Sequence, residues 1–310
     1  MRASRGIWAQ MASADRQEAA VARDKSQRLA DKIGALKQEI ARLRGMEEQM
    51  LKAPDQQISL TDPDARSMAT SGRGTGMVGY NVQTAVEARH HLIVAHDVTN
   101  TGHDRTQLNR MAVLAKEAIG SPALEVVAGR GYFRGEEIRA CDAAQITTYL
   151  PKPQTSGNLA KGLFGKRDFI YQPDTDTYAC PAGERLIYRF TRQEKGLTIH
   201  RYWSSACPHC HLRPQCTTGV YRRVSRWEHE AVVEAAERRL DQQPKRMRVR
   251  RCTVEHPFGT LKSWMGHTHF LTRTLPRVST EMSLHVLAYN LKRVIRILGA
   301  QPLIMAMSRA

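Results

Sequence analysis

Apolar residues in the first fifty positions recur at steps of three, four or seven. They lie in a charged, proline-free segment from about Arg16 to Leu51, and this spacing is typical of a coiled-coil-like helix. Residues 1–16 show no clear pattern, and Ala53-Pro54 is expected to end the helix. With about three heptads, an intramolecular helix pair and a dimer seam fit equally well. The apolar positions are Leu29, Ile33, Leu36, Ile40, Leu43 and Met50.

Between residues 79 and 150 the pattern changes to alternating strands and helices. The segments YNVQTAVEA and HLIVAHDVT flank a polar break, Arg89-His90-His91, and predict a β-hairpin over about 79–99. Helical spacing runs from Asp104 to Ile119. A short apolar strand at 124–128, a helix at 136–144 and a strand reading ITTYLP follow. This order predicts an α/β fold with a mixed sheet and flanking helices.

Residues 151–225 are rich in turns and carry a cysteine cluster, so we interpret them as an insert. Helical patterning returns at 229–240 and again at about 277–298. The chain therefore divides into a helical segment (1–54), a first α/β part (55–150), the insert (151–225) and a C-terminal helical part (226–310). We expect the last helix to close the core with a broad apolar face formed by Met282, Leu284, Val286, Leu287, Leu291, Val294, Ile295 and Leu298.

The charge balance indicates a polyanionic partner. There are 47 Lys and Arg against 30 Asp and Glu, a formal net charge of +17, and neutralisation of phosphates drives sequence-independent binding to nucleic acid. No apolar run is long enough to cross a membrane, and the N-terminal residues do not look like a secretory signal. We expect a cytoplasmic protein with reduced cysteines.

Four cysteines have the spacing C-x26-C-x2-C-x5-C. They are Cys180, Cys207, Cys210 and Cys216. The C-x2-C pair places two thiolates on one turn, and two more complete a tetrahedral set that suits a structural Zn²⁺ in a zinc-ribbon-like insert. His209 or His211 could replace one ligand, and four reduced cysteines without metal are the alternative. Cys141 and Cys252 lie in helical patterns and are expected to fill the core.

The strand at 124–128 ends in LEVVAGRGYFRG. Active sites of α/β folds collect at the carboxyl ends of strands, yet the residue at this tip, Gly129, has no side chain. The tip is either a plain turn or a site that lacks its polar group.

A second candidate follows the basic stretch PKRMRVRR, which contains Arg248 and Arg250. Arg251, Glu255 and Lys262 are spaced to share one face of a helix. A carboxylate between cations can bind a metal ion beside DNA phosphates. The same pattern also fits an ordinary solvated salt-bridge face.

These segments together resemble the DDE transposases of bacterial insertion sequences, in the branch with a cysteine-rich insert. The resemblance runs from about Arg16 to Gly299 and rests on SLTDPDARSM, GYNVQTAVEARHHLIVAHDVTNTGHDRTQL, VVAGRGYF, VEHPFGTLK and LHVLAYNLKRV. It implies a ribonuclease-H-like fold that cuts and joins DNA ends with two Mg²⁺ ions held by three carboxylates.

Carried over to this chain, the resemblance makes Glu255 the third carboxylate, with Arg251 and Lys262 beside it. Arg248 stands where the family has a tyrosine, and Gly129 stands where the family has its second Asp. The first Asp belongs to an early strand followed by Gly and Ser or Thr, and no such stretch is found. We therefore expect a chain truncated at its N-terminus, with only part of the ribonuclease-H-like sheet.

The resulting hypothesis is a transposase that binds insertion-sequence ends through Arg248, Arg250, Arg251 and Lys262 without cutting them. One glutamate cannot hold two Mg²⁺ ions. Four other aspartates do not follow the right strand and are not expected to substitute: Asp62, Asp64, Asp97 and Asp104.

Two alternatives come from other classes. The first is a regulator without chemistry that occupies transposon ends, pairs with itself or joins an intact transposase through the helical stripe. The second is a zinc hydrolase using His90, His91, His96 and His103, although these histidines lack ligand spacing.

Overall fold

The computed structural model describes residues 2–68 and 76–308. Side chains of the first helix are described at Met11, at Ser13 and from Lys25 onward, and that of Ala306 is excluded. The chain forms two compact units, residues 1–67 and 68–310, and each is considered by itself.

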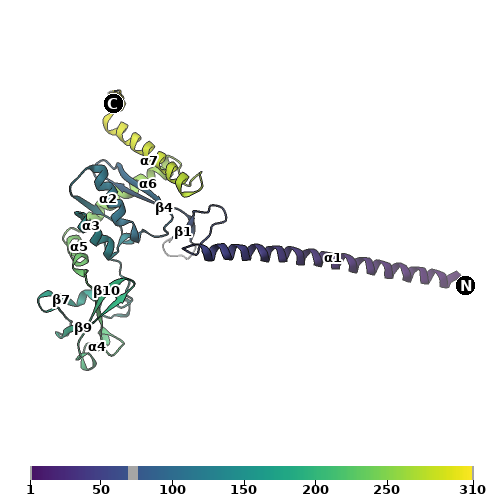
Figure 1. The fold of residues 1–310 in the computed structure, drawn as a ribbon, viewed down its shortest axis with the longest axis horizontal. Coiled ribbons are helices and arrows are strands. Elements are labelled where there is room, and N and C mark those ends of the chain that lie inside the picture. Colours follow the sequence, from purple (N-terminus) through teal and green to yellow (C-terminus); the bar gives the residue numbers. More distant parts are fainter. Residues whose placement is uncertain (1, 69–75, 309–310) are drawn as a thin grey trace. The chain divides into compact units, whose positions relative to one another are not determined.

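The first unit is dominated by one long helix, α1 (Arg2–Lys52; Figure 1). The predicted helix is confirmed, and it begins earlier than expected, because residues 2–16 are rich in alanine and contain no proline to stop it. Its apolar stripe is open: Leu29 and Leu36 are 60% and 62% exposed. No second helix covers the stripe within the described residues of this unit. After α1, the Asp55 carboxylate pairs with Arg66.

The second unit opens with short strands and the predicted hairpin. β1 (Arg66–Met68) includes the boundary between the two units, and β2 (Met77–Gly79) follows. β3 (Asn81–Val86) and β4 (Ile93–Thr99) pair antiparallel. Glu87 fixes the turn, because its carboxylate accepts hydrogen bonds from the backbone N–H groups of Arg89, His90 and Leu92.

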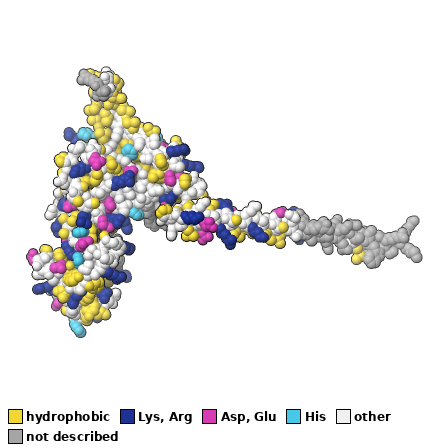
Figure 2. All heavy atoms as spheres, viewed as in Figure 1, with side chains coloured by type: hydrophobic (Ala, Val, Ile, Leu, Met, Phe, Trp, Pro, Cys, Tyr) yellow, Lys and Arg dark blue, Asp and Glu magenta, His cyan; other side chains and the backbone are white. Residues whose placement is uncertain are grey.

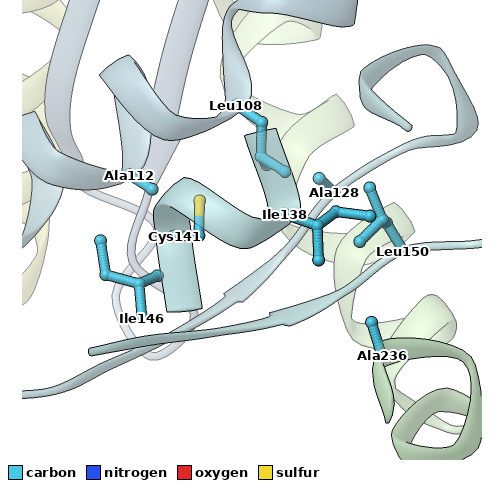
Figure 3. Close-up of a cluster of buried hydrophobic side chains, with 8 residues drawn as sticks. All are labelled: Leu108, Ala112, Ala128, Ile138, Cys141, Ile146, Leu150 and Ala236. Carbon is cyan, nitrogen blue, oxygen red and sulfur yellow. The ribbon is translucent and has the colours of Figure 1, made fainter. Parts of the chain in front are cut away.

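The predicted helices and strands of the next fifty residues are also confirmed. The 3₁₀ turn η1 (Asp104–Thr106) leads into α2 (Leu108–Ile119). β5 (Leu124–Val127) and β6 (Ile146–Tyr149) pair parallel, connected by the 3₁₀ turn η2 (Arg130–Tyr132) and α3 (Gly135–Ala143). The core where α2, α3, β6 and α5 (Glu230–Gln242) meet is drawn in Figure 3. It consists of Leu108, Ala112, Ala128, Ile138, Cys141, Ile146, Leu150 and Ala236.

The hairpin and the parallel pair do not join into one sheet. β3 pairs only with β4 and β5 only with β6 among the described strands, so each pair is a separate two-stranded sheet. The helix α6 (Arg246–Gly259) contacts both β3 and β5. The expected mixed sheet is therefore present as two parts held by helices.

The insert is more ordered than its composition indicates. Its strands form one antiparallel sheet in the order β11-β10-β9-β8-β7. A sheet was not predicted for this turn-rich stretch. Tyrosines supply the core, with Tyr178 and Tyr202 fully buried and their rings 5.2 Å apart at 68°. The strands are β7 (Ile170–Gln172), β8 (Thr177–Ala179), β9 (Arg185–Glu194), β10 (Leu197–Trp203) and β11 (Val224–Trp227).

Short helical turns complete the insert. These are η3 (Leu159–Lys161), η4 (Lys166–Asp168), η5 (Pro173–Thr175), η6 (Cys207–His209) and α4 (Arg213–Cys216).

Helices form the C-terminal part. α5 (Glu230–Gln242) and α7 (Leu275–Leu298) confirm the predicted pair, and α8 (Ala300–Met307) follows. Between α6 and α7, a π-helix, η7 (Thr260–Trp264), continues from α6. None of the helices in the described part of the chain is long and apolar enough to span a bilayer.

Only one side of α7 closes a core. Val278, Met282, Val286 and Tyr289 are buried in the cluster that also holds Ile93 and Val98 of β4. Leu284, Leu287, Leu291, Ile295 and Leu298, which we expected to be buried, are 41–63% exposed. Apolar side chains accordingly cover much of the C-terminal helix in Figure 2. A helix that is apolar all round needs partners on every side. Among the described residues, the hairpin packs against one side of α7.

An ion-pair cluster attaches the insert to α5. Lys166 Nζ lies 2.6 Å from Glu230 Oε1, and Lys152 Nζ lies 2.6 Å from Glu237 Oε1. Burial raises the pKa of Glu230, but the two lysines and the Trp227 N–H outweigh it and hold this pKa below its ordinary value. Since the folded-state pKa is depressed, the stabilisation is present above the unfolded pKa and is lost as the pH falls through the folded one.

We expect Glu230→Gln to lower the free energy of unfolding by about 1–3 kcal/mol at pH 7, because it leaves Lys166 without its charged partner. Thermal melts at pH 7 and at about pH 3.5 measure the effect, and the difference from wild type should shrink at the lower pH. Glu228→Gln, at an exposed neighbouring carboxylate, is the matched control. A pH-independent loss, or an equal loss in both variants, contradicts the assignment.

Candidate active site

The carboxyl end of β5 presents Gly129, and the backbone there does not require glycine. Gly129 has φ −79° and ψ 167°, an extended conformation that any residue adopts. The ladder with β6 continues to Ala128, whose N–H donates to the Tyr149 carbonyl at 3.0 Å. The Gly129 carbonyl accepts from the Tyr132 N–H at 3.1 Å and closes the turn η2. A side chain at position 129 would therefore project from the end of a regular strand.

A cation occupies the space in front of Gly129. A Cβ at this position would lie 3.1 Å from Nη2 of Arg250, which projects from α6. No carboxylate lies within ion-pair distance of Arg250 in the described part of the chain. The two residues are 121 positions apart, so local spacing could not reveal the contact.

A polar cluster lies beside the same turn. Asp104 Oδ1 accepts hydrogen bonds from Asn81 Nδ2 and Gln83 Nε2, both at 2.9 Å, and Gln83 Oε1 accepts from the Tyr132 hydroxyl. A Cβ at Gly131 would lie 3.1 Å from Asp104 Oδ2. Burial raises the pKa of Tyr132 well above its ordinary value; Asp104 adds to this and Arg250 opposes it. Tyr132 therefore lies within reach of both charges.

This cluster places Asp104, one of the four aspartates that were not expected to substitute, at the candidate site. Asp104 belongs to the 3₁₀ turn η1 and does not follow a strand. Asn81 and Gln83 share one face of β3, since they are two residues apart. The alternation of Asn81 and Gln83 along the strand was the sequence feature that could have indicated this polar cluster. Two side-chain amides already donate hydrogen bonds to Asp104, and these contacts support the fold. Asp97 forms an ion pair with Arg110 at 2.9 Å.

The expected acidic residue of α6 lies elsewhere on the helix. Glu255 is exposed, and within the described residues it forms neither an ion pair nor a hydrogen bond. Arg248 and Arg251 are exposed as well. Lys262 belongs to the π-helix η7, so the α-helical spacing that placed it on one face with Glu255 does not extend to it. The structure thus brings Arg250, and not Glu255, to Gly129.

A cavity of about 290 Å³ separates the two strand pairs. Thr84–Ala88 of the hairpin and Leu124–Gly129 line opposite parts of it. α2 contributes Leu108, Met111, Ala112, Ala115 and Ile119, and α6 contributes Val249, Arg250, Thr253 and Val254. Glu255 is not among the lining residues.

The four cysteines of the insert line one small cavity, together with Phe169 and Leu186. Burial raises the pKa of Cys216; Arg222 opposes this, and Cys207, Cys180 and Cys210 add to it. The four cysteines therefore share one cavity. Still, no three side chains of the metal-binding types converge closely enough to hold an ion anywhere in the described residues. Cys141 is fully buried, as predicted, but Cys252 is exposed, so its assignment to the core was wrong.

The histidines proposed for a hydrolase have separate partners. His96 Nε2 lies 2.9 Å from the Ser283 hydroxyl, and the rings of His91 and His256 are 5.2 Å apart. His90 lies near Glu87, and His103 is exposed. The described residues hold no group of three ligands, so this alternative has no support.

Residues 179–295 match the family model described as transposase DDE domain. The match begins in β8, continues through α5 and α6 and ends in α7, so it includes Glu255 and the cysteines and starts after Gly129. No curated protein and no solved structure matches the chain. The match supports a DDE transposase.

We expect Gly129→Asp to be tolerated and to raise the free energy of unfolding by about 0.5–1 kcal/mol. The extended backbone accepts a side chain, and the new carboxylate meets Arg250. Chemical denaturation of Gly129→Asp, Arg250→Gln and the double variant measures the coupling, which should vanish when Arg250 is removed. Gly79→Asp, where a Cβ meets nothing within 4 Å, is the control. Destabilisation by Gly129→Asp with Arg250 present would contradict the contact.

Proposed function

We propose that this chain is a DDE transposase that binds the ends of an insertion sequence but does not cut or join them. The observation that carries the proposal is the pair Gly129 and Arg250, because a guanidinium stands where the strand end would need a carboxylate. The transposase match in residues 179–295 supports the family. A DNA partner in a bacterium also implies a cytoplasmic location.

The chemical argument concerns charge around metal ions. Two Mg²⁺ ions beside a polyanion need several carboxylate oxygens, and a nearby cation raises the energy of each ion. Of the family's three carboxylates, this sequence retains Glu255, which is exposed. The residues at the candidate site do not fit a pair of Mg²⁺ ions, so no catalytic step is assigned to them.

DNA binding is proposed for α6 and the turn that follows it. Arg248 and Arg251 are exposed on this helix and Lys262 lies on η7. Arg250, directed to Gly129, would contribute at the inner edge. Cations on one helix suit phosphate contacts, which position a protein on a duplex and do not specify its sequence.

We expect the purified chain to bind duplex DNA with an affinity that falls steeply with salt. Fluorescence anisotropy titrations over a range of salt concentrations measure the slope of the logarithm of the binding constant against the logarithm of the salt concentration. Arg248→Ala and Arg251→Ala should each reduce it by about one unit. Arg139→Ala, at an exposed arginine of α3, should leave it unchanged. An equal effect of all three variants would contradict the assignment to α6.

The same DNA, carrying the terminal repeats of the element, tests the lack of chemistry. With Mg²⁺ or Mn²⁺ present, neither the wild type nor Gly129→Asp should nick or join it, because one restored carboxylate still leaves the first one missing. Cleavage by the wild type, or recovery by Gly129→Asp alone, would overturn the proposed inactivity without affecting the DNA-binding result.

We also propose a structural Zn²⁺ bound by the four cysteines of the insert. Thiolates are its preferred ligands, and a full set leaves no open position for catalysis. Because the insert has an aromatic core of its own, the ion would fix the loops around η6 and α4 and would not be required for the sheet.

We expect elemental analysis to find about one zinc per chain, since a structural site of this type holds one ion. Cys207→Ser should abolish the zinc and lower the melting temperature, while the β-sheet circular dichroism persists. Cys252→Ser, at an exposed cysteine outside the set, should change neither. Metal-free protein with an unchanged melting temperature contradicts the proposal.

A second candidate function is a regulator that acts by pairing with itself or with an intact transposase. The observation that favours it is the open stripe of α1, where Leu29, Ile33 and Leu36 are 44–62% exposed. Such a stripe is typical of a helix that lacks its partner. A chain that binds DNA only after an intact transposase has been added would favour this candidate over the first.

A further inference from the structure

We propose that the outer side of the insert's sheet binds single-stranded DNA by stacking unpaired bases on exposed aromatic rings. None of the residues that form this surface belongs to α6. The choice of DNA rests on the proposed function, whereas the stacking surface itself does not. The surface consists of three aromatic side chains and two arginines: Phe190, Trp203, Tyr221, Arg189 and Arg223.

The sheet of the insert carries aromatic side chains on both of its sides. Tyr202 of β10 pairs with Tyr188 of β9, and Arg201, next to Tyr202, pairs with Phe190. Since neighbouring residues of a strand point to opposite sides, Phe190 and Trp203 share the side that Tyr202 does not occupy. Tyr202 is fully buried in the core of the insert. Phe190 and Trp203 therefore lie on the outer side.

Three rings form a continuous open surface on this side. The Phe190 and Trp203 rings are 5.9 Å apart at 74°, and the Trp203 and Tyr221 rings are 6.3 Å apart at 41°. Phe190 is 42% exposed and Tyr221 is 36% exposed. Scattered apolar residues on a surface need no explanation, but a contiguous exposed cluster is typical of a binding site. The rings are therefore arranged to meet a flat apolar partner.

Two guanidinium groups lie over the central ring. The Cζ atoms of Arg189 and Arg223 are 5.2 and 5.5 Å from the centroid of Trp203. Arg189 is the extra residue at the irregularity between β9 and β10, and such a bulge redirects a side chain. Its guanidinium donates to the Trp203 carbonyl and to the Ser205 hydroxyl. Within the described residues neither arginine forms an ion pair, so the charge of both is available to a ligand.

The charge around the rings favours a polyanion. β9, β10 and the turn between them contain five cations against a single carboxylate, Glu194, which is paired with Arg201. An acidic peptide would supply negative charge without flat groups that stack. Single-stranded DNA supplies both, because its phosphates are anionic and its base faces are free, whereas the bases of a duplex cover one another. The five cations are Arg185, Arg189, Arg192, Lys195 and Arg201.

Fluorescence anisotropy of a labelled oligo-dT tests the proposal with the full chain. A length of about 12 nucleotides lies within the usual site size for such surfaces. We expect Phe190→Ala and Tyr221→Ala each to weaken binding at least about fivefold, because each removes a ring on which a base stacks. Circular dichroism checks that each variant retains its sheet.

The opposite side of the same sheet offers a matched control. Tyr188 belongs to β9, as Phe190 does, and has a similar exposed fraction of 44%, but it shares the side of Tyr202. Tyr188→Ala should therefore bind oligo-dT as the wild type does. Arg223→Ala should reduce the salt slope of oligo-dT binding by about 0.7 units, the value for one contact to a single strand.

Photo-crosslinking locates the bound strand. An oligo-dT that carries one 5-iodouracil should cross-link to fragments containing Phe190, Trp203 or Tyr221. Duplex DNA separates this surface from α6. Combining Phe190→Ala with Tyr221→Ala should leave duplex binding unchanged, and the Arg248→Ala and Arg251→Ala pair should weaken duplex binding without removing the cross-links.

Four results would contradict the proposal. Equal effects of Tyr188→Ala and Phe190→Ala, or cross-links confined to α6, would overturn it. Polyglutamate that competes as well as unlabelled oligo-dT would overturn it as well, because recognition would then depend on charge alone. Tighter binding of oligo-rU than of oligo-dT would overturn the choice of DNA. Failure of duplex binding at α6 would count against the proposed function and would leave the single-strand results unaffected.

Discussion

Backbone hydrogen bonding across the second unit is the constraint on which the other features depend. A strand buried between helices has no water to satisfy its edges, so each edge must find another strand. The hairpin and the β5–β6 pair each satisfy one edge internally. Their facing sides lie against α2 and α6, and the Tyr132 hydroxyl, after β5, donates to Gln83 of β3.

The same constraint explains the character of the candidate site. In α/β folds the chemistry collects where neighbouring strands end together. Among the described strands β5 has a neighbour on one side, and its carboxyl end carries Gly129. Arg250 supplies a positive charge at the point where a hard cation would need negative oxygens.

Local periodicity predicted most elements of the α/β part. The hairpin, α2, β5, α3 and β6 occur where alternating or helical spacing placed them, because each covers one side of a core and its pattern records that. α7 shows the limit of this approach. Its sequence is apolar all round, and a local pattern cannot say how many sides have partners, so Leu284 and Leu291 were wrongly assigned to a core.

Long-range contacts and helix irregularities also could not be predicted from the sequence. Arg250 and Gly129 meet through tertiary packing, and the π-helix at Thr260–Trp264 changes the register that Lys262 was expected to follow. In the insert, apolar residues were few but aromatic rings were large, and Tyr178 and Tyr202 bury enough surface to organise a sheet. Burial depends on area and not on number, so a few large rings can form a core.

The core of the α/β part does not depend on a side chain at the end of β5. A cluster of carboxylates that awaits metal ions carries like-charge repulsion, and such sites are maintained for function at the expense of stability. Gly129 lies beside Arg250 without a negative charge of its own, and its extended backbone suits any residue. The packing of α2, α3 and β6 around Ile138 and Leu150 does not involve that position's side chain. The core can therefore form whichever residue ends β5, and Arg248 and Arg251 remain exposed on α6.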